Sequence, residues 1–334
     1  MRCTTGEAVP PCPIVTTSDA DDLMTPEDVV LMQGLAQRIV AARPKFINPD
    51  ASFGELAWIW GKGHLAWRDT WPKRLWFDAE GRLVAWGWAQ MPFHVVRTDG
   101  TEKDVADISV AFQVHPDHEE LVDEVIAWFE SITPAGVDRR VILQSNDEYG
   151  LARWAAFGYL PDPEAEEDWT RQNIRKLDDI DVPTLPEGYR LRTAAEVGHD
   201  AAAQAHVQAW WPSSTTVEMY QGLKGTATYR PDLHVVVEAP DGTMAASAIV
   251  WFDEVNQAVE FEPVGTHPEH RRRGLAQAVM EQGMLLAKQA GAVEATVVCD
   301  GTPGNGVLRL YESVGFREYT RDVTLLKPAT KQAG

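Results

Sequence analysis

Three consecutive arginines followed by a glycine are the residues best suited to chemistry in this sequence. Arg271, Arg272 and Arg273 lie at the end of a strand-like stretch, and Gly274 opens a helix-like one. Arginine side chains make charge-assisted, often bidentate contacts with phosphate groups. The free N–H groups and the dipole of a helix N-terminus favour an anion at the same place, and glycine lets a ligand approach the backbone. The segment therefore predicts a pyrophosphate-binding loop.

Two carboxylates precede this loop on the same strand. Glu260 and Glu262 are two residues apart, so both side chains face the same side of a strand. Two close carboxylates raise the pKa of one of them toward neutrality, which suits a general base that deprotonates an amine. The alternative interpretations are that the pair only attracts a cationic substrate, or that it lies on the surface.

The loop and its surroundings resemble the GNAT superfamily of N-acetyltransferases. Arg271, Gly274 and Ala276 fit its [QR]-x-x-G-x-[GA] signature, and the run Tyr-Glu-Ser-Val-Gly-Phe at 311–316 resembles its closing motif. By motif, the resemblance covers residues 188–328. It implies an α/β fold with a mixed, mostly antiparallel sheet flanked by helices, and acetyl-CoA as the cosubstrate with no metal.

The resemblance also implies roles for single residues. The implied cofactor-binding residues are Val264, Gly265, Thr266, Arg271, Arg272, Arg273, Gly274, Leu275, Ala276 and Asn305. In histone-modifying members the base lies eleven residues before the motif, which gives Glu260 here, with Glu262 as the second carboxylate. Tyr311 matches the tyrosine that protonates the departing thiolate. The alternatives are a core position for Tyr311 and an Asn-Gly turn for Asn305.

A strand N–H polarises the thioester carbonyl in this family, and Pro263 cannot be that donor because it has no N–H.

The elements that must position this site occur twice. The second half predicts helices at 194–209, 217–223 and 274–290 and strands at 233–239, 244–252, 259–266 and 294–299. The first half predicts helices at 25–42 and 119–132 and strands at 74–77, 82–90, 105–114 and 140–144. Three landmarks recur in the same order: His-Pro-acid-His at 115–118 and 267–270, an acid-Gly turn at 80–81 and 241–242, and a Gly-aromatic pair at 158–159 and 315–316. The sequence therefore predicts a duplicated domain of about 150 residues.

The first half lacks the residues that would form a phosphate-binding loop. Four acids stand where the arginine loop belongs, at Glu119, Glu120, Asp123 and Glu124, and Val122 blocks close approach to the backbone. Trp154 occupies the place of Tyr311. Seven of the 13 tryptophans fall between residues 58 and 88. They predict core and interdomain packing, and the alternative is that some line an acceptor pocket.

Composition limits the classes of function and the cellular location that the sequence allows. A net charge of -20 argues against a general nucleic-acid binder and is compatible with a cationic amine, although solubility is the simpler interpretation. No segment is long and apolar enough to cross a bilayer or to act as a signal peptide. Three scattered cysteines fit a reducing, cytoplasmic location. The two His-x-x-His pairs predict turn caps rather than metal ligands.

Together these features predict two tandem GNAT domains packed as a pseudo-dimer, in a monomer or a homodimer. The predicted divisions are a disordered tail (1–22), a degenerate first domain (23–177), a linker (178–187), a catalytic second domain (188–328) and a tail (329–334). The predicted activity is direct transfer of an acetyl group from acetyl-CoA to a small-molecule primary amine, such as an antibiotic, amino sugar or amino-acid derivative. The alternatives are a mycothiol synthase-like acetyltransferase and a non-catalytic acyl-CoA-binding or sensing protein.

Overall fold

The computed structural model describes residues 16–17, 24–44, 52–134, 136–165, 169–302, 304 and 306–329. The described helices are α1 (Pro26–Ala42), α2 (Phe53–Trp67), α3 (Leu121–Ile132), α4 (Glu148–Ala156), α5 (Ala194–Val197), α6 (His199–Ala209), α7 (Val217–Tyr220), α8 (Leu275–Ala290) and α9 (Gly306–Ser313). The strands of the first half are β1 (Thr16–Thr17), β2 (Lys73–Phe77), β3 (Leu83–Gln90), β4 (Phe93–Val96), β5 (Glu102–Val105), β6 (Ile108–Val114), β7 (Arg139–Gln144), β8 (Leu160–Pro161) and β9 (Thr170–Lys176). Those of the second half are β10 (Arg190–Thr193), β11 (His234–Glu238), β12 (Met244–Asp253), β13 (Ala258–Thr266), β14 (Glu294–Asp300) and β15 (Arg317–Lys327).

The strands of both halves join in a single sheet. Over the described residues it has 13 strands in the order β1-β2-β3-β6-β7-β15-β9-β14-β13-β12-β11-β10, with β8 beside β15. Only the pairs β6–β7 and β13–β14 are parallel. The predicted fold class, α/β with mixed and mostly antiparallel sheets flanked by helices, is confirmed, and the sheets predicted for the two halves are continuous with each other.

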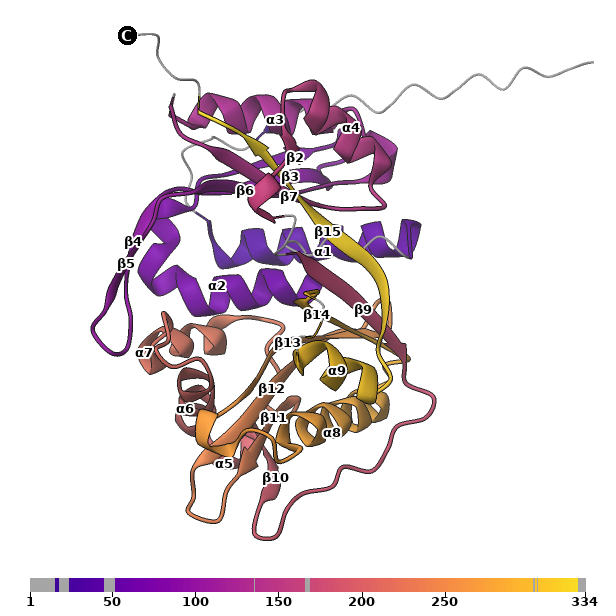
Figure 1. Ribbon diagram of the computed structural model, residues 1–334. Helices are drawn as coiled ribbons and strands as arrows, with labels where there is room; N and C mark the ends of the chain where they lie inside the picture. The colour runs from indigo at the N-terminus through magenta and orange to yellow at the C-terminus, as the bar shows by residue number, and fades with distance from the viewer. Residues whose placement is uncertain are drawn as a thin grey trace, which may run out of the picture.

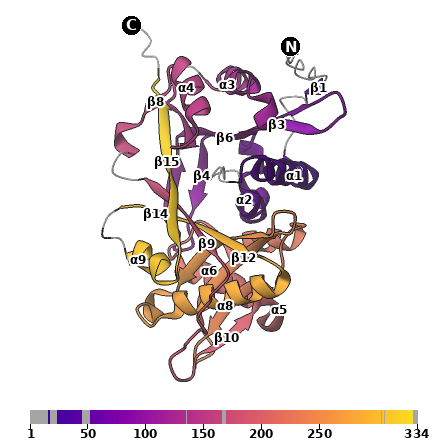
Figure 2. The ribbon, with the colours of Figure 1, turned by 90° about the vertical axis from the view of Figure 1, so that its right-hand side faces the viewer.

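The two halves exchange their last strands at the centre of this sheet. β9, which ends the first half, pairs with β14 of the second half and with the beginning of β15. β15 then continues upward and pairs with β7 and β8 of the first half. Figures 1 and 2 show β15 as the yellow strand that runs from the lower half into the upper one. Because each half completes the other's sheet, the two halves are held as one unit.

A layer made of α1 and α2 separates the two halves (Figure 1). α1 begins with a capping box, in which Thr25 and Asp28 bond to each other's backbone N–H. α2 begins at Ser52, whose side chain accepts a hydrogen bond from the N–H of Glu55. One face of this layer packs on β2 and β3, and Trp58 of α2 packs into a second cluster with Trp251 of β12.

The internal repeat is visible in backbone geometry. His115 and His267 each accept a hydrogen bond from the N–H two residues later at 3.2 Å, and each precedes a short 3₁₀ turn. Gly158 and Gly315 both have positive φ, at 89° and 84°, and each is followed by a buried aromatic residue. The predicted turn-capping role of His267 is confirmed, and His115 caps the corresponding turn of the first half.

Several elements differ from those predicted. The sequence did not predict α2, the β4–β5 hairpin, α4 or β9, and the single helix predicted at 194–209 is broken at Gly198, where φ is 88°. Of the predicted disordered tail at 1–22, only Thr16 and Thr17 lie within the described residues, and they pair with β2. No helix among the described residues is long and apolar enough to span a membrane.

Candidate active site

The arginine-glycine loop connects β13 to α8, as the sequence predicted. Arg272 and Gly274 have left-handed backbone conformations, with φ of 62° and 78°. A Cβ placed on Gly274 would meet no atom within 4 Å, so the space in front of the α8 N-terminus is open. Arg271 does not extend into that space, because its guanidinium donates to the carbonyls of Thr266 (3.3 Å) and Ala209 (3.2 Å). Arg272 and Arg273 are exposed cations beside the helix N-terminus.

Strand β13 separates from β14 between Glu260 and Glu262. Its parallel pairing with β14 ends at Phe261 opposite Val297, although β13 continues to Thr266. On the other side, a register shift against β12 places an extra residue in β13 between Phe261 and Val264. The backbone of residues 262–266 therefore has one edge that is not paired with β14. Val264 packs partly on the core of this half, and Gly265 lies against Trp210.

A cavity of about 510 Å³ opens beside this bulge. Glu262 and Pro263 of β13 form part of its wall, and α6 contributes His206. The remaining walls come from α2, the β4–β5 hairpin and the segment 210–215. Trp58, Trp67 and Trp71 line it, and the other tryptophans of this region are buried in cores. The predicted packing role of the tryptophans is therefore confirmed, since Trp58 and Trp71 are also buried in core clusters. That some of them line an acceptor pocket stays a prediction.

Glu262 is the carboxylate that faces this cavity. Burial and the neighbouring charge of Glu260 raise the pKa of Glu262 to about 7, against the opposing effect of the positive charge of Lys62. The backbone carbonyl of Glu262 accepts a 2.6 Å hydrogen bond from the indole of Trp251, which fixes the strand at this residue. A carboxyl group with a pKa near neutrality in a cavity wall is suited to take a proton from a bound amine.

Glu260 has a different environment. Its two oxygens accept hydrogen bonds from the hydroxyl of Ser52 (2.7 Å) and from the backbone N–H of Gly54 (2.9 Å), at the beginning of α2. Burial raises the pKa of Glu260, and these hydrogen bonds oppose the rise. A Cβ on Gly54 would lie 2.6 Å from one oxygen of Glu260, so this contact requires glycine. Glu260 is placed to connect the two halves and to influence Glu262 by its charge.

Tyr311 lies on α9 with 5 % of its surface exposed. Its ring packs edge-on against Phe316 at 6.2 Å, inside the core of the second half. Burial and the charge of Glu262 raise the pKa of the Tyr311 hydroxyl, which keeps it protonated at neutral pH. Leu275 is buried in the same core. Asn305 lies outside the described residues.

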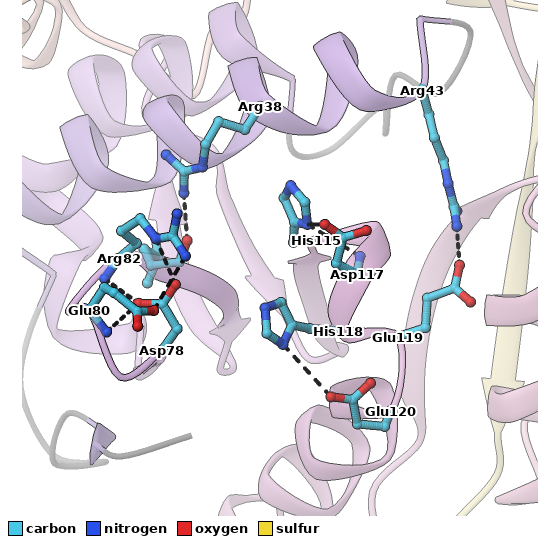
Figure 3. A network of polar contacts seen from close by, with 11 residues as sticks. Arg38, Arg43, Asp78, Glu80, Arg82, His115, Asp117, His118, Glu119 and Glu120 are labelled. Carbon is cyan, nitrogen blue, oxygen red and sulfur yellow. Dashed lines mark hydrogen bonds and ion pairs between the residues drawn. The ribbon is translucent and has the colours of Figure 1, made fainter. Parts of the chain in front are cut away.

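In the first half, acidic side chains at the place of the arginine loop have partners within the fold, and Figure 3 shows one such pair, Arg43 with Glu119. Glu119 forms an ion pair with Arg43, Asp123 with Arg153, and the carboxylate of Glu124 accepts from Trp76. No register shift accompanies the β3–β6 pairing over residues 85–90. The space between β6 and α4 is a cavity of only about 30 Å³. Trp154 packs edge-on against Tyr159 at 4.7 Å, as Tyr311 does against Phe316.

Several residues of the site were not identified from the sequence. Ser52 and Gly54, at the beginning of α2, bind Glu260. Lys62 of α2 and His206 of α6 line the cavity. The pattern Ser52-x-x-Glu55 before an apolar run is a helix-start signal that could have revealed α2. Nothing local could have shown that α2 lies against β13.

Comparison with known proteins finds a family match in the second half. Residues 194–316 match the model of the acetyltransferase (GNAT) family. No curated protein matches the chain by sequence.

Solved structures share the whole fold at low identity. A GCN5-related N-acetyltransferase from Sphaerobacter thermophilus is 20% identical, with a TM-score of 0.56, covering 92% of this chain and 95% of its own. A tandem GNAT protein from the clavulanic acid biosynthesis pathway is 15% identical, with a TM-score of 0.60, covering 93% and 98%. The chain thus has the fold of this tandem GNAT protein, and residues 194–316 of its second half match the acetyltransferase (GNAT) family.

Proposed function

We propose that this protein is an acetyl-CoA-dependent N-acetyltransferase that acetylates a small-molecule primary amine by direct transfer. The observation that supports this most strongly is the position of Glu262. It is the first residue of β13 beyond the last pair with β14, and it lies in the wall of the 510 Å³ cavity. A proton acceptor therefore stands where the open strand edge meets the cavity.

The residues of the second half fit acyl-CoA. The open space at Gly274, the N-terminus of α8 and the exposed cations Arg272 and Arg273 suit a pyrophosphate group. The unpaired edge of Val264, Gly265 and Thr266 suits a pantetheine arm added as a strand. Leu275 and Ala276 belong to the first turn of α8, and Arg271 fixes the loop to the end of β13.

In the proposed reaction the amine nitrogen attacks the thioester carbonyl carbon. The new C–N bond forms, the C–S bond breaks, and the products are an N-acetyl amine and CoA. Glu262 takes the proton from the amine, and the protonated hydroxyl of Tyr311 supplies one to the departing thiolate. Glu260 keeps Glu262 in position and raises its pKa.

The first half acts in this proposal as part of the acceptor site. We propose that residues 23–177 form the degenerate domain and residues 188–328 the catalytic one, although β9 completes the sheet of the second half. The cavity of about 30 Å³ beside Glu119 and Val122 is too small for an acyl-CoA, which argues against a second acyl-CoA site. α2 and the β4–β5 hairpin of the first half instead form walls of the cavity.

The activity is tested with a panel of primary amines and acetyl-CoA, reading the release of free thiol. We expect turnover with at least one amine, and a loss of about 10²–10⁴-fold in Glu262→Gln at equal acyl-CoA affinity. Tyr311→Phe should reduce turnover too. Tight acetyl-CoA binding without turnover of any amine would favour the alternative of a non-catalytic acyl-CoA sensor.

A further inference from the structure

The acceptor cavity has a charge opposite to that of the rest of the molecule. The chain has 50 acidic and 30 basic residues. Among the residues that line the cavity, however, the cations Lys62, Arg97 and Lys103 outnumber the acids Glu55 and Glu262. An excess of cations around one cavity of an acidic protein attracts anions to that cavity. Solubility would not require the cations to gather there.

These cations form no close ion pair, although the charge of Lys62 acts on Glu262. Within the part of the chain that the structure describes, Lys62, Arg97 and Lys103 form no ion pair, whereas buried Lys73 pairs with Asp28 at 2.6 Å. The amine of Lys62 lies 4.8 Å from the ring centre of Trp58, an arrangement typical of a cation–π contact.

The acids of the β4–β5 hairpin have partners of their own, although the charge of Arg97 also acts on Asp99. Asp104 contacts His94 at 2.8 Å, Glu102 lies 3.8 Å from the same ring, and Asp99 accepts hydrogen bonds from Thr101.

The hairpin holds its cations over the cavity through two contacts with the second half. The N–H of Thr98 donates to the carbonyl of Ser213 at 2.9 Å, and the N–H of Ser213 donates to the Thr98 hydroxyl at 2.9 Å. Arg97 directly precedes Thr98. In Figure 1 the hairpin extends from the upper half toward α6 and α7.

A buried polar atom in the cavity wall also lacks a partner. The Nδ1 atom of His206 is buried and has no hydrogen bond within the described residues, and 5 % of the residue is exposed. Its ring stacks on Trp210 at 4.4 Å and meets Trp58 edge-on at 5.0 Å. Burial lowers the pKa of His206 to about 3, so the ring is neutral and can exchange one hydrogen bond with a ligand. Buried nitrogens of this kind normally have a partner.

We propose that the acceptor is a primary amine that also carries an anionic group, a carboxylate or a phosphate. The amine lies toward Glu262, the anionic group meets Arg97 and Lys103, and the aromatic walls hold the part between them. This inference rests on the proposed function for the identity of the reacting amine, but the anion site can be tested by binding alone.

The test compares matched pairs of amines that differ only in the anion. The pairs are 4-(aminomethyl)benzoate with benzylamine, and phosphoethanolamine with ethanolamine. Binding to the full-length protein is measured by calorimetry and by tryptophan fluorescence, without acyl-CoA. We expect the anionic member of at least one pair to bind about tenfold or more tightly, as a charge-assisted contact predicts, and the difference to shrink with added salt. The pair in which the anionic amine binds more tightly shows whether the site prefers a carboxylate or a phosphate.

Variants locate the anion site. Arg97→Gln combined with Lys103→Gln should remove the preference for the anionic amine and leave the neutral amine unchanged. Lys62 is left intact because its charge acts on Glu262. The matched control is Arg317→Gln combined with Lys288→Gln, which removes the same charge from exposed positions outside the cavity.

Three results would overturn the proposal: equal or weaker binding of both anionic amines, no binding in either pair, or a preference that survives the double substitution at Arg97 and Lys103. Failure of the proposed function gives a different result. In that case no amine releases thiol from acetyl-CoA, while the binding difference within the pairs remains.

Discussion

Ser52 and Glu260 are 208 residues apart in the chain, and their side chains are joined by a 2.7 Å hydrogen bond. The bond connects the N-cap residue of α2 in the first half to β13 in the second half. The carboxylate at the family's base position is therefore held by the other half of the duplication. This arrangement leaves Glu262, two residues later, as the carboxylate that faces the cavity.

Removal of the Ser52 hydroxyl should destabilise the interface between the halves. Ser52→Ala leaves a buried carboxylate oxygen without its donor, and we expect a loss of about 1–3 kcal/mol in the free energy of unfolding. The loss should be larger at pH 8 than at pH 5, because the charged form of Glu260 needs the donor more. Denaturant unfolding at the two pH values measures it. Ser313→Ala, which removes an exposed hydroxyl bonded to Leu310, is the control and should have little effect.

The pH dependence of turnover should report Glu262. A base must be deprotonated to act, so kcat at saturating acceptor should rise as pH increases through about 7, the pKa of Glu262. His206 is neutral throughout this range, and Tyr311 stays protonated. In Glu262→Gln the rise should disappear along with most of the activity. The same rise in that variant would assign the pH dependence to another group.

At high pH the charged side chain of Glu262 should lower the free energy of unfolding. Its folded pKa is above the ordinary value of 4.5, so the folded state binds the proton more tightly than the unfolded chain does. Its stabilising contribution is complete below about pH 4.5 and is lost as pH rises through about 7. Glu262→Gln should therefore melt at a higher temperature than the native protein at pH 8, with a smaller difference at pH 5. Glu187→Gln, at an exposed position, should show no such trend.

One molecule of CoA should bind per chain. Calorimetry should give a stoichiometry of one, and Gly274→Glu should weaken binding by at least about tenfold, because it places a carboxylate in the pyrophosphate space. Gly242→Glu is a matched control, since Gly242 also has positive φ, at 88°, and an open Cβ position. Two tight sites would contradict our interpretation of the first half, and equal losses in both variants would indicate strain rather than a lost anion site.

The fold could be predicted in large part because its signals are local. The capping box at Thr25, the acid-glycine turns and the helix-forming pattern after Gly274 each act within a few residues. The duplication followed from landmarks in a constant order. α2 was missed because its glycines and tryptophans resemble neither an amphipathic helix nor a strand, and most of its surface is buried against other elements.

The sequence by itself determined the arginine-glycine loop, the pair of carboxylates and the absence of such a loop in the first half, because each depends on residue types within one short segment. Only the tertiary structure decided which carboxylate faces the cavity and which is bound by α2. It also placed Lys62, Arg97 and Lys103 around one space and exchanged the last strands between the halves. These results depend on contacts between elements that are far apart in the chain. No local sequence pattern specifies which distant element will pack against a given residue.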